Sequence, residues 1–202
     1  MVPMQLLCFR HPMTIAKLNA SLNLPSPVAW HYGAPAMILH WTLALLIAGT
    51  AALGSYMTSV EDKTGSAKYF EWHKSIGIAI AALVLARVLW RLTHAPAELP
   101  STVAIWQVRL SSITEALLYT LMVLVPLTGC LGASYSQSGV QFFGISTPVW
   151  AAPGRATAEQ LLDIHSVLIG ALLSLVALHV TGALVHTFWY KDTVLRRMWF
   201  NG

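Results

Sequence analysis

Five of the eight histidines lie in or beside long apolar stretches of the sequence: His40, His73, His165, His179 and His186. An imidazole can bind a metal, carry a proton or exchange hydrogen bonds. An ionisable side chain at membrane depth is costly, so it is a functional candidate by default. Each histidine taken alone is explained equally well as a hydrogen-bonded structural residue. Their chemistry must therefore be judged from the arrangement of the whole set.

Two of these histidines share one helix face. His165 and His179 are 14 residues apart, which at 100° per residue falls about 40° short of whole turns and places them about 21 Å apart along the helix. One such helix would therefore present two imidazoles on the same side at two depths. A zinc or copper site needs three or four ligands at one depth, so a split set of this kind disfavours metal handling.

The composition indicates that lipid surrounds the chain. Hydrophobic residues make up 56% of the 202 residues and charged residues only 10%, whereas soluble domains carry about 25% charged residues. Four apolar runs cover residues 35–57, 73–92, 113–135 and 161–188, and about 20 apolar residues suffice for a helix to cross a bilayer. We therefore expect an all-α fold, an integral membrane four-helix bundle.

The basic residues predict an orientation in the membrane. Arg10 and Lys17 precede the first run, Arg91 and Arg109 flank the middle loop, and Arg196 and Arg197 follow the last run. Because lysine and arginine accumulate in cytoplasmic loops, both termini are expected in the cytoplasm. Residues 1–30 are interpreted as a cytoplasmic extension and residues 31–202 as the membrane domain. The net charge of +4 is spread between apolar runs, so no nucleic-acid partner is expected. The apolar segment 142–150 is expected to lie against the membrane or to cap the bundle.

This topology pairs the histidines. His73 begins the second run on the outer side, level with His165, and His40 lies a few residues into the first run from the inner side, level with His179. Facing histidines at two depths suit two bis-histidine haems b, in which the occupied axial positions leave only electron transfer to the iron. The sequence therefore predicts the ligand pairs His73/His165 and His40/His179.

Several residues near these four are weaker candidates. Arg87 and Arg91 can hold haem propionates, or extend to lipid phosphates instead, and Lys74 is a further candidate contact of the cofactor. Gly77, Gly170 and Gly182 can make room for a porphyrin, or allow close helix packing. His186 is a candidate quinone contact or proton relay, with a surface histidine as the alternative, and Glu115 has no assigned role.

At this point the segments resemble a known family. MILHW around His40, EWHKSIG around His73, LDIH around His165 and ALHVTGALVH across His179 and His186 are similar to those of the bacterial cytochrome b561 family. RVLWR, LYTLMVLVPLTG and the tail YKDTVLRRM match as well. The resemblance covers Tyr32 to Met198 and implies that the chain lies in a bacterial inner (plasma) membrane. Glu115 departs from it, because many members have a histidine there.

The resemblance implies haem ligation by the same four histidines and electron exchange with ubiquinone or another quinone, with His186 at the quinone-associated position. An oxidoreductase with quinone as acceptor or donor would follow, in a respiratory or oxidative-defence role, as a single chain or a homo-oligomer. Lys68, Lys74 and Arg155 would favour a small anionic donor such as superoxide on the outer side. The alternatives are a membrane anchor cytochrome b subunit for a soluble dehydrogenase or hydrogenase partner, and a haem-free metal-handling membrane protein.

Overall fold

Four long helices form the membrane domain, in a computed structural model that describes residues 32–94, 104–137, 139–147, 151–192 and 194–199. The predicted extension, residues 1–30, lies outside these ranges. The helices are α2 (Ala34–Ser59), α3 (Ala67–Thr93), α4 (Ile105–Tyr135) and α5 (Arg155–Val185). All four are long and apolar enough to cross a membrane, so the prediction of an all-α protein with four membrane spans is confirmed.

Three helices begin earlier than the apolar runs suggested. α3 begins at Ala67, α4 at Ile105 and α5 at Arg155, six to eight residues ahead of runs that start at 73, 113 and 161. The apolar run marks only the part of a helix that lies in hydrocarbon. The backbone hydrogen bonds continue into the polar interface, where charged residues such as Lys68 and Arg109 are tolerated.

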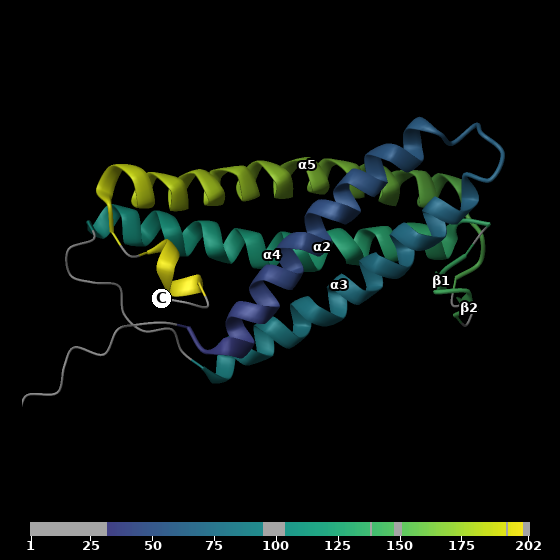
Figure 1. Cartoon of the computed structure of the whole chain (residues 1–202). Helices are drawn as coiled ribbons and strands as arrows, with labels where there is room; N and C mark the ends of the chain where they lie inside the picture. The colour runs from purple at the N-terminus through teal and green to yellow at the C-terminus, as the bar shows by residue number, and fades with distance from the viewer. Residues whose placement is uncertain (1–31, 95–103, 138, 148–150, 193, 200–202) are drawn as a thin grey trace, which may run out of the picture. The chain divides into compact units, whose positions relative to one another are not determined.

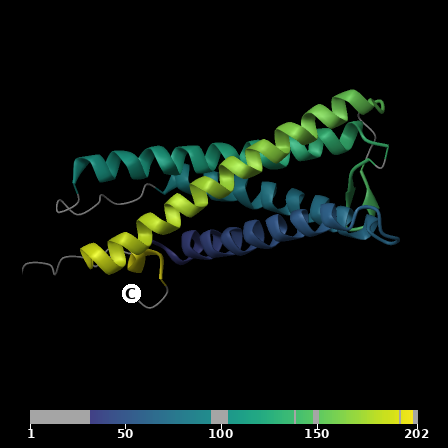
Figure 2. The same ribbon diagram turned by 90° about the horizontal axis from the view of Figure 1, so that it is seen from above.

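The helices pack as two neighbouring pairs (Figures 1 and 2), α2 beside α3 and α4 beside α5, with α3 also packed on α4. Leu43, Ile80 and Val84 form the buried core between α2 and α3. Gly132 allows α5 to approach α4, because a Cβ at this position would lie 3.0 Å from the Leu162 side chain. Many large apolar side chains point outward, among them Leu45, 73% exposed. Such an exposed apolar surface suits lipid and not water.

A short β-hairpin lies at one end of the bundle (Figure 1), which we call the hairpin end. Strands β1 (Gln141–Phe142) and β2 (Ile145–Ser146) pair antiparallel, joined by Phe143 and Gly144 with φ of 47° and 82°. A two-residue turn with both φ values positive is the type favoured in hairpins. The sequence prediction for 142–150 did not include strands, and residues 148–150 lie outside the described ranges.

The hairpin is fastened to α3 directly after His73. The Lys74 Nζ donates to the Gly139 carbonyl at 2.9 Å, and the Phe143 amide donates to the Ser75 hydroxyl at 2.9 Å. Ser75 is almost fully buried, with 1% of its surface exposed. Lys74 thus holds the loop in place, at a position where it was expected to contact a cofactor.

The described ends of the chain meet at the opposite end of the bundle, the terminal end. The Tyr32 amide donates to the Arg197 carbonyl at 3.1 Å, and the Trp41 indole N–H donates to the Met198 carbonyl at 2.8 Å. α5 continues through a π-helical turn, His186–Tyr190, and a 3-10 turn follows at Leu195–Met198. These contacts hold the C-terminal turns against the start of α2.

Candidate cofactor sites

Two pairs of histidines face each other inside the bundle. The first pair is His73 on α3 and His165 on α5, with ring centroids 6.2 Å apart and ring planes at 86°. The second pair is His40 on α2 and His179 on α5, with centroids 6.3 Å apart and planes at 65°. The structure therefore brings together the same residues that the topology predicted to face each other. The first pair lies toward the hairpin end and the second toward the terminal end.

The spacing within each pair suits one metal atom between two imidazoles. Bonds of about 2.0–2.1 Å to both nitrogens would hold the centroids about 6.2–6.6 Å apart, since each centroid lies roughly 1.1–1.2 Å behind its nitrogen. Edge-to-face aromatic contacts cover about 4.5–7 Å, so the distance alone fits a direct contact as well. The space around the rings distinguishes the two cases.

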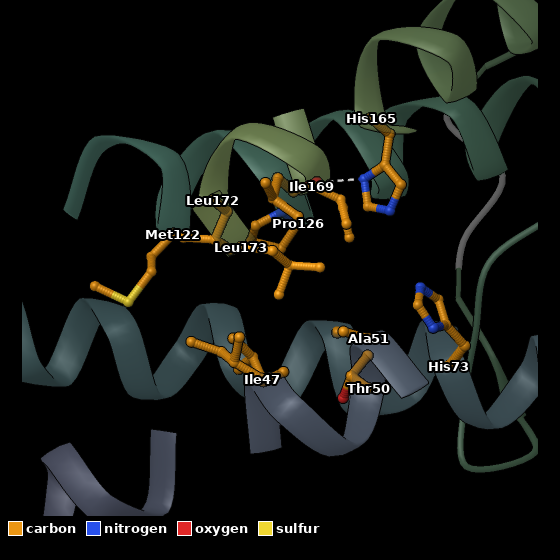
Figure 3. A pocket seen from close by; sticks show the side chains of 13 residues that line it. Ile47, Thr50, Ala51, His73, Met122, Pro126, His165, Ile169, Leu172 and Leu173 are labelled. Atoms are coloured by element: carbon orange, nitrogen blue, oxygen red, sulfur yellow. Dashed lines mark hydrogen bonds between the residues drawn. The ribbon is translucent and has the colours of Figure 1, made fainter. Parts of the chain in front are cut away.

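A pocket opens between the two histidines of the first pair (Figure 3), and the two rings point toward each other across it. The space between its lining atoms, including the part that is open to the surroundings, is about 510 Å³. Apart from the histidines and Thr50, its walls are apolar, with Ile80, Met122 and Leu172 among them. A direct ring contact would need no such space, whereas a flat apolar macrocycle with a central metal would fill it.

The three glycines that the sequence singled out do not serve close packing between described helices. A Cβ added at Gly77, Gly170 or Gly182 would meet no described atom within 4 Å. Gly77 also lines the pocket. Of the two explanations weighed for these residues, the geometry favours space for a cofactor at Gly77.

His165 is oriented by a backbone carbonyl. Its Nδ1 lies 2.8 Å from the Val125 oxygen, and a carbonyl only accepts, so Nδ1 carries the proton. The neutral ring then presents Nε2 as a lone pair, the state that a metal ligand requires. His73 Nδ1 is buried without a hydrogen bond of good geometry to any described residue, although the Thr50 backbone lies close enough to interact with it.

Arg87 lies against the second pair. Its Nη1 donates to the Ala36 carbonyl at 2.9 Å, and its Nη2 lies 3.3 Å from His40 Nδ1. A guanidinium only donates, so in this arrangement His40 Nδ1 is the acceptor. If Nε2 of His40 bound a metal, Nδ1 would carry the proton, and Arg87 would turn to another acceptor.

Arg91 and Glu115 form an ion pair between α3 and α4, with nitrogen and oxygen 2.9 Å apart. Glu115, for which the sequence suggested no role, is thus the partner of Arg91. It also lies near enough to His179 for an electrostatic interaction. Arg91 is therefore already neutralised by a carboxylate, which makes Arg87 the better candidate of the two for binding a propionate.

His186 lies beyond both pairs, at the terminal end of α5. Its Nδ1 is 2.6 Å from the Asp192 carboxylate, and Asp192 also caps the turn by accepting from the Val194 amide at 3.0 Å. The sequence reasoning did not single out Asp192. Its position in the tail motif, six residues after His186, was the available signal.

The histidine pairs bridge helices that have little direct packing with each other. The first pair joins α3 to α5 and the second joins α2 to α5, whereas the extensive contacts among the described helices are α2 with α3, α3 with α4 and α4 with α5. Among the described residues, no three histidine, cysteine, aspartate or glutamate side chains converge on one point. Four membrane helices with facing histidines in such gaps are the arrangement of a membrane cytochrome.

Comparison with known proteins agrees with this class. Residues 31–201 match the model of the family described as prokaryotic cytochrome b561, and the chain belongs to this family. It is 32% identical over 171 residues to cytochrome b561 homolog 2 of Escherichia coli (strain K12), covering 83% of this chain and 90% of that protein. It is 26% identical over 163 residues to cytochrome b561 homolog 1 of the same organism, covering 79% of this chain and 92% of that protein.

A further relative is described as the probable superoxide oxidase CybB of Yersinia pestis, 25% identical over 170 residues, with 79% of this chain and 90% of that protein covered. Membership in the family implies haem b as the cofactor and electron transport as its use. The pocket, the ring spacing and the orientation of His165 fit such a group. The chain is therefore a prokaryotic membrane cytochrome with four candidate spans.

Proposed function

We propose that this cytochrome carries electrons across the bacterial inner membrane through two haems b, one held by His73 and His165 and the other by His40 and His179, and exchanges them with the quinone pool. The observation that supports this best is the presence of two histidine pairs with ring centroids 6.2 and 6.3 Å apart. Their α5 members lie about 21 Å apart along the helix. Two redox centres at two depths are what electron transfer across a membrane requires.

Bound haem would supply one-electron redox chemistry, and two histidine ligands for each of the two irons would leave neither iron an open position for oxygen. The protein residues orient and insulate it. The Val125 carbonyl accepts the Nδ1 proton of His165, which increases the basicity of a ligating Nε2. The apolar walls of the pocket exclude water. Arg87, once released from His40 Nδ1, has a haem propionate as its natural acceptor.

A quinone would be bound near the terminal end, at His186. With Asp192 accepting from Nδ1, the Nε2 of His186 is available to hydrogen-bond a quinone carbonyl and to exchange the proton that accompanies reduction. The Asp192 carboxylate would stabilise the ring while it is charged. This end is proposed to face the cytoplasm, because Arg196 and Arg197 lie there.

The test is a count of haems per chain. The purified protein and the variants His40→Ala, His73→Ala, His165→Ala and His179→Ala are compared by pyridine haemochrome assay and by reduced-minus-oxidised spectra. We expect about two haems b in the wild type, one centre lost on substitution within the first pair, and the other lost within the second. His94→Ala is the control, since His94 is an exposed histidine stacked on Trp90. Haem content that does not depend on the four histidines would refute the proposal.

Superoxide is a candidate electron donor for this cytochrome, because one relative is described as a probable superoxide oxidase. Of the three cations considered, Arg155 is paired with Glu159 at 2.8 Å and Lys74 binds the Gly139 carbonyl. Lys68 lies over the Tyr69 ring at 5.0 Å. If these three cations attract the superoxide anion, superoxide should reduce the cytochrome more slowly at low ionic strength when all three side chains are replaced by neutral ones. An unchanged rate would exclude this role for them.

A further inference from the structure

Two glycines lie in contact with the imidazole rings of the first pair. A Cβ added at Gly129 on α4 would lie 2.9 Å from His165 Cε1 and 3.0 Å from its Nδ1. A Cβ added at Gly54 on α2 would lie 3.1 Å from His73 Cε1. Carbon atoms do not approach each other so closely without displacement. Each ring therefore rests on the bare backbone of the helix that precedes its own in the chain.

Each ring lies near the backbone one turn before its glycine. Val125, four residues before Gly129, accepts from His165 Nδ1 at 2.8 Å. The Thr50 backbone, four residues before Gly54, lies near His73, although His73 Nδ1 makes no hydrogen bond of good geometry to a described residue. In an α-helix the Cβ of a residue tilts toward the N-terminus, over the turn that contains the carbonyl four residues earlier. A ring that reaches this carbonyl from outside therefore needs glycine at the later position.

The second pair is built differently. A Cβ added at any of the described glycines would have no described atom of His40 or His179 among its nearest neighbours within 4 Å, and the planes of these two rings are at 65° instead of 86°. A guanidinium, Arg87, lies against His40. The two sites thus differ in what holds their rings, although both have the same ligand type.

We propose that Gly129 and Gly54 are positioning residues of the His73/His165 site. They allow the two rings to rest on α4 and α2 with nearly perpendicular planes, and Gly129 lets His165 donate to the Val125 carbonyl. This inference rests on the proposed ligation of haem by His73 and His165. The glycines act through the ligands: the ring orientation sets the electronic structure of the iron, and the hydrogen bond sets the electron donation of His165.

The test uses Gly129→Ala and Gly54→Ala in the full-length protein. Gly49→Ala is the matched control, because Gly49 lies on the same helix as Gly54 and a Cβ there would meet no described atom within 4 Å. The readouts are the low-spin ferric electron paramagnetic resonance signals, the midpoint potentials of the two haems and the haem content. Circular dichroism and gel filtration select the variants that remain folded.

We expect Gly129→Ala to change the resonance signal and the potential of one haem, or to release that haem alone, while the other haem keeps its wild-type properties. Gly54→Ala should have a smaller effect on the same haem, since the added methyl group would lie further from its ring. Gly49→Ala should match the wild type. If Gly129→Ala does not fold, the test is the change in the resonance signal and midpoint potential of this haem in Gly54→Ala relative to Gly49→Ala.

Two results separate the inference from the function on which it rests. If both glycine variants keep wild-type signals and potentials while His165→Ala and His73→Ala still lose one haem, the positioning role is wrong and the ligation stands. If His165→Ala and His73→Ala retain two haems, the ligation itself is wrong, and the positioning role is refuted with it.

Discussion

Replacing Arg87 with glutamine removes a positive charge beside the second pair and should lower the midpoint potential of the haem that we propose His40 and His179 to hold, called here the second haem. Arg87 Nη2 lies 3.3 Å from His40 Nδ1, and after a turn to another acceptor the guanidinium would still lie beside this ring, roughly 7 Å from a metal bound at Nε2. At an effective dielectric constant of about 20, a unit charge at roughly 7 Å is worth about 2 kcal/mol. For a one-electron couple this equals about 100 mV, and partial exposure of Arg87 reduces the expectation to about 50–100 mV.

The sign follows from charge. A nearby cation disfavours the ferric state, which carries one more positive charge than the ferrous state, so its loss stabilises the oxidised form and lowers the potential. The first haem is further away, at roughly 25 Å, where the same calculation gives about 30 mV or less. Removing Arg87 should therefore lower the potential of the second haem relative to that of the first.

The assay is a spectroelectrochemical titration of both haems in detergent or nanodiscs. Arg87→Lys retains the charge and should keep the potential of the second haem close to the wild-type value. The double variant Arg91→Gln/Glu115→Gln removes an ion pair with no net change of charge, and should move the same potential much less than Arg87→Gln does. A potential of the second haem within about 20 mV of the wild type, or above it, would show that Arg87 does not act on this haem in the way calculated.

Two further predictions concern the contacts that fix the ends of the bundle. Ser75→Ala removes the acceptor of the Phe143 amide, so backbone hydrogen exchange should increase in the β-hairpin and not in the helices; Ser134→Ala, which loses only a bond within its own helix, is the control, and unchanged exchange would mean that Ser75 does not hold the hairpin. Trp41→Phe removes the hydrogen bond to the Met198 carbonyl and should destabilise the protein by about 1 kcal/mol, measured as a lower thermal midpoint. Trp72→Phe, at an exposed position, should leave the midpoint unchanged, and equal effects of the two substitutions would contradict this assignment.

The sequence predicted the four spans because membrane helices carry their own signal, an apolar run long enough to cross the hydrocarbon core. It also predicted which histidines face each other, since an up-and-down order of four spans puts His73 level with His165 and His40 level with His179. Those arguments need only depth along the membrane normal. Neither requires knowledge of how any helix is rotated about its own axis.

The features that the sequence did not reveal depend on rotation and register. Whether Glu115 faces Arg91 or lipid is decided by the fit of α4 against α3. Gly129 is the last residue of the segment LYTLMVLVPLTG, but the sequence does not show that the packing of α5 on α4 brings His165 into contact with it. The hairpin was missed because four strand residues carry almost no periodic signal. Its anchor on Ser75 joins residues 68 positions apart.

Each histidine pair joins two helices that make little direct contact with each other. A cofactor bound by each pair would therefore hold these helices together in addition to carrying electrons. α2 with α3 and α4 with α5 can insert as two helical hairpins, as their packing suggests. Each haem would then join the α2–α3 hairpin to the α4–α5 hairpin. Without haem, the described connections between the two would be the contact of α3 with α4, the β-hairpin on α3 and the C-terminal turns on α2. Chains that receive haem during biogenesis would accordingly be more stable and would be degraded less by membrane proteases. The amount of this protein in the cell would therefore follow the supply of haem.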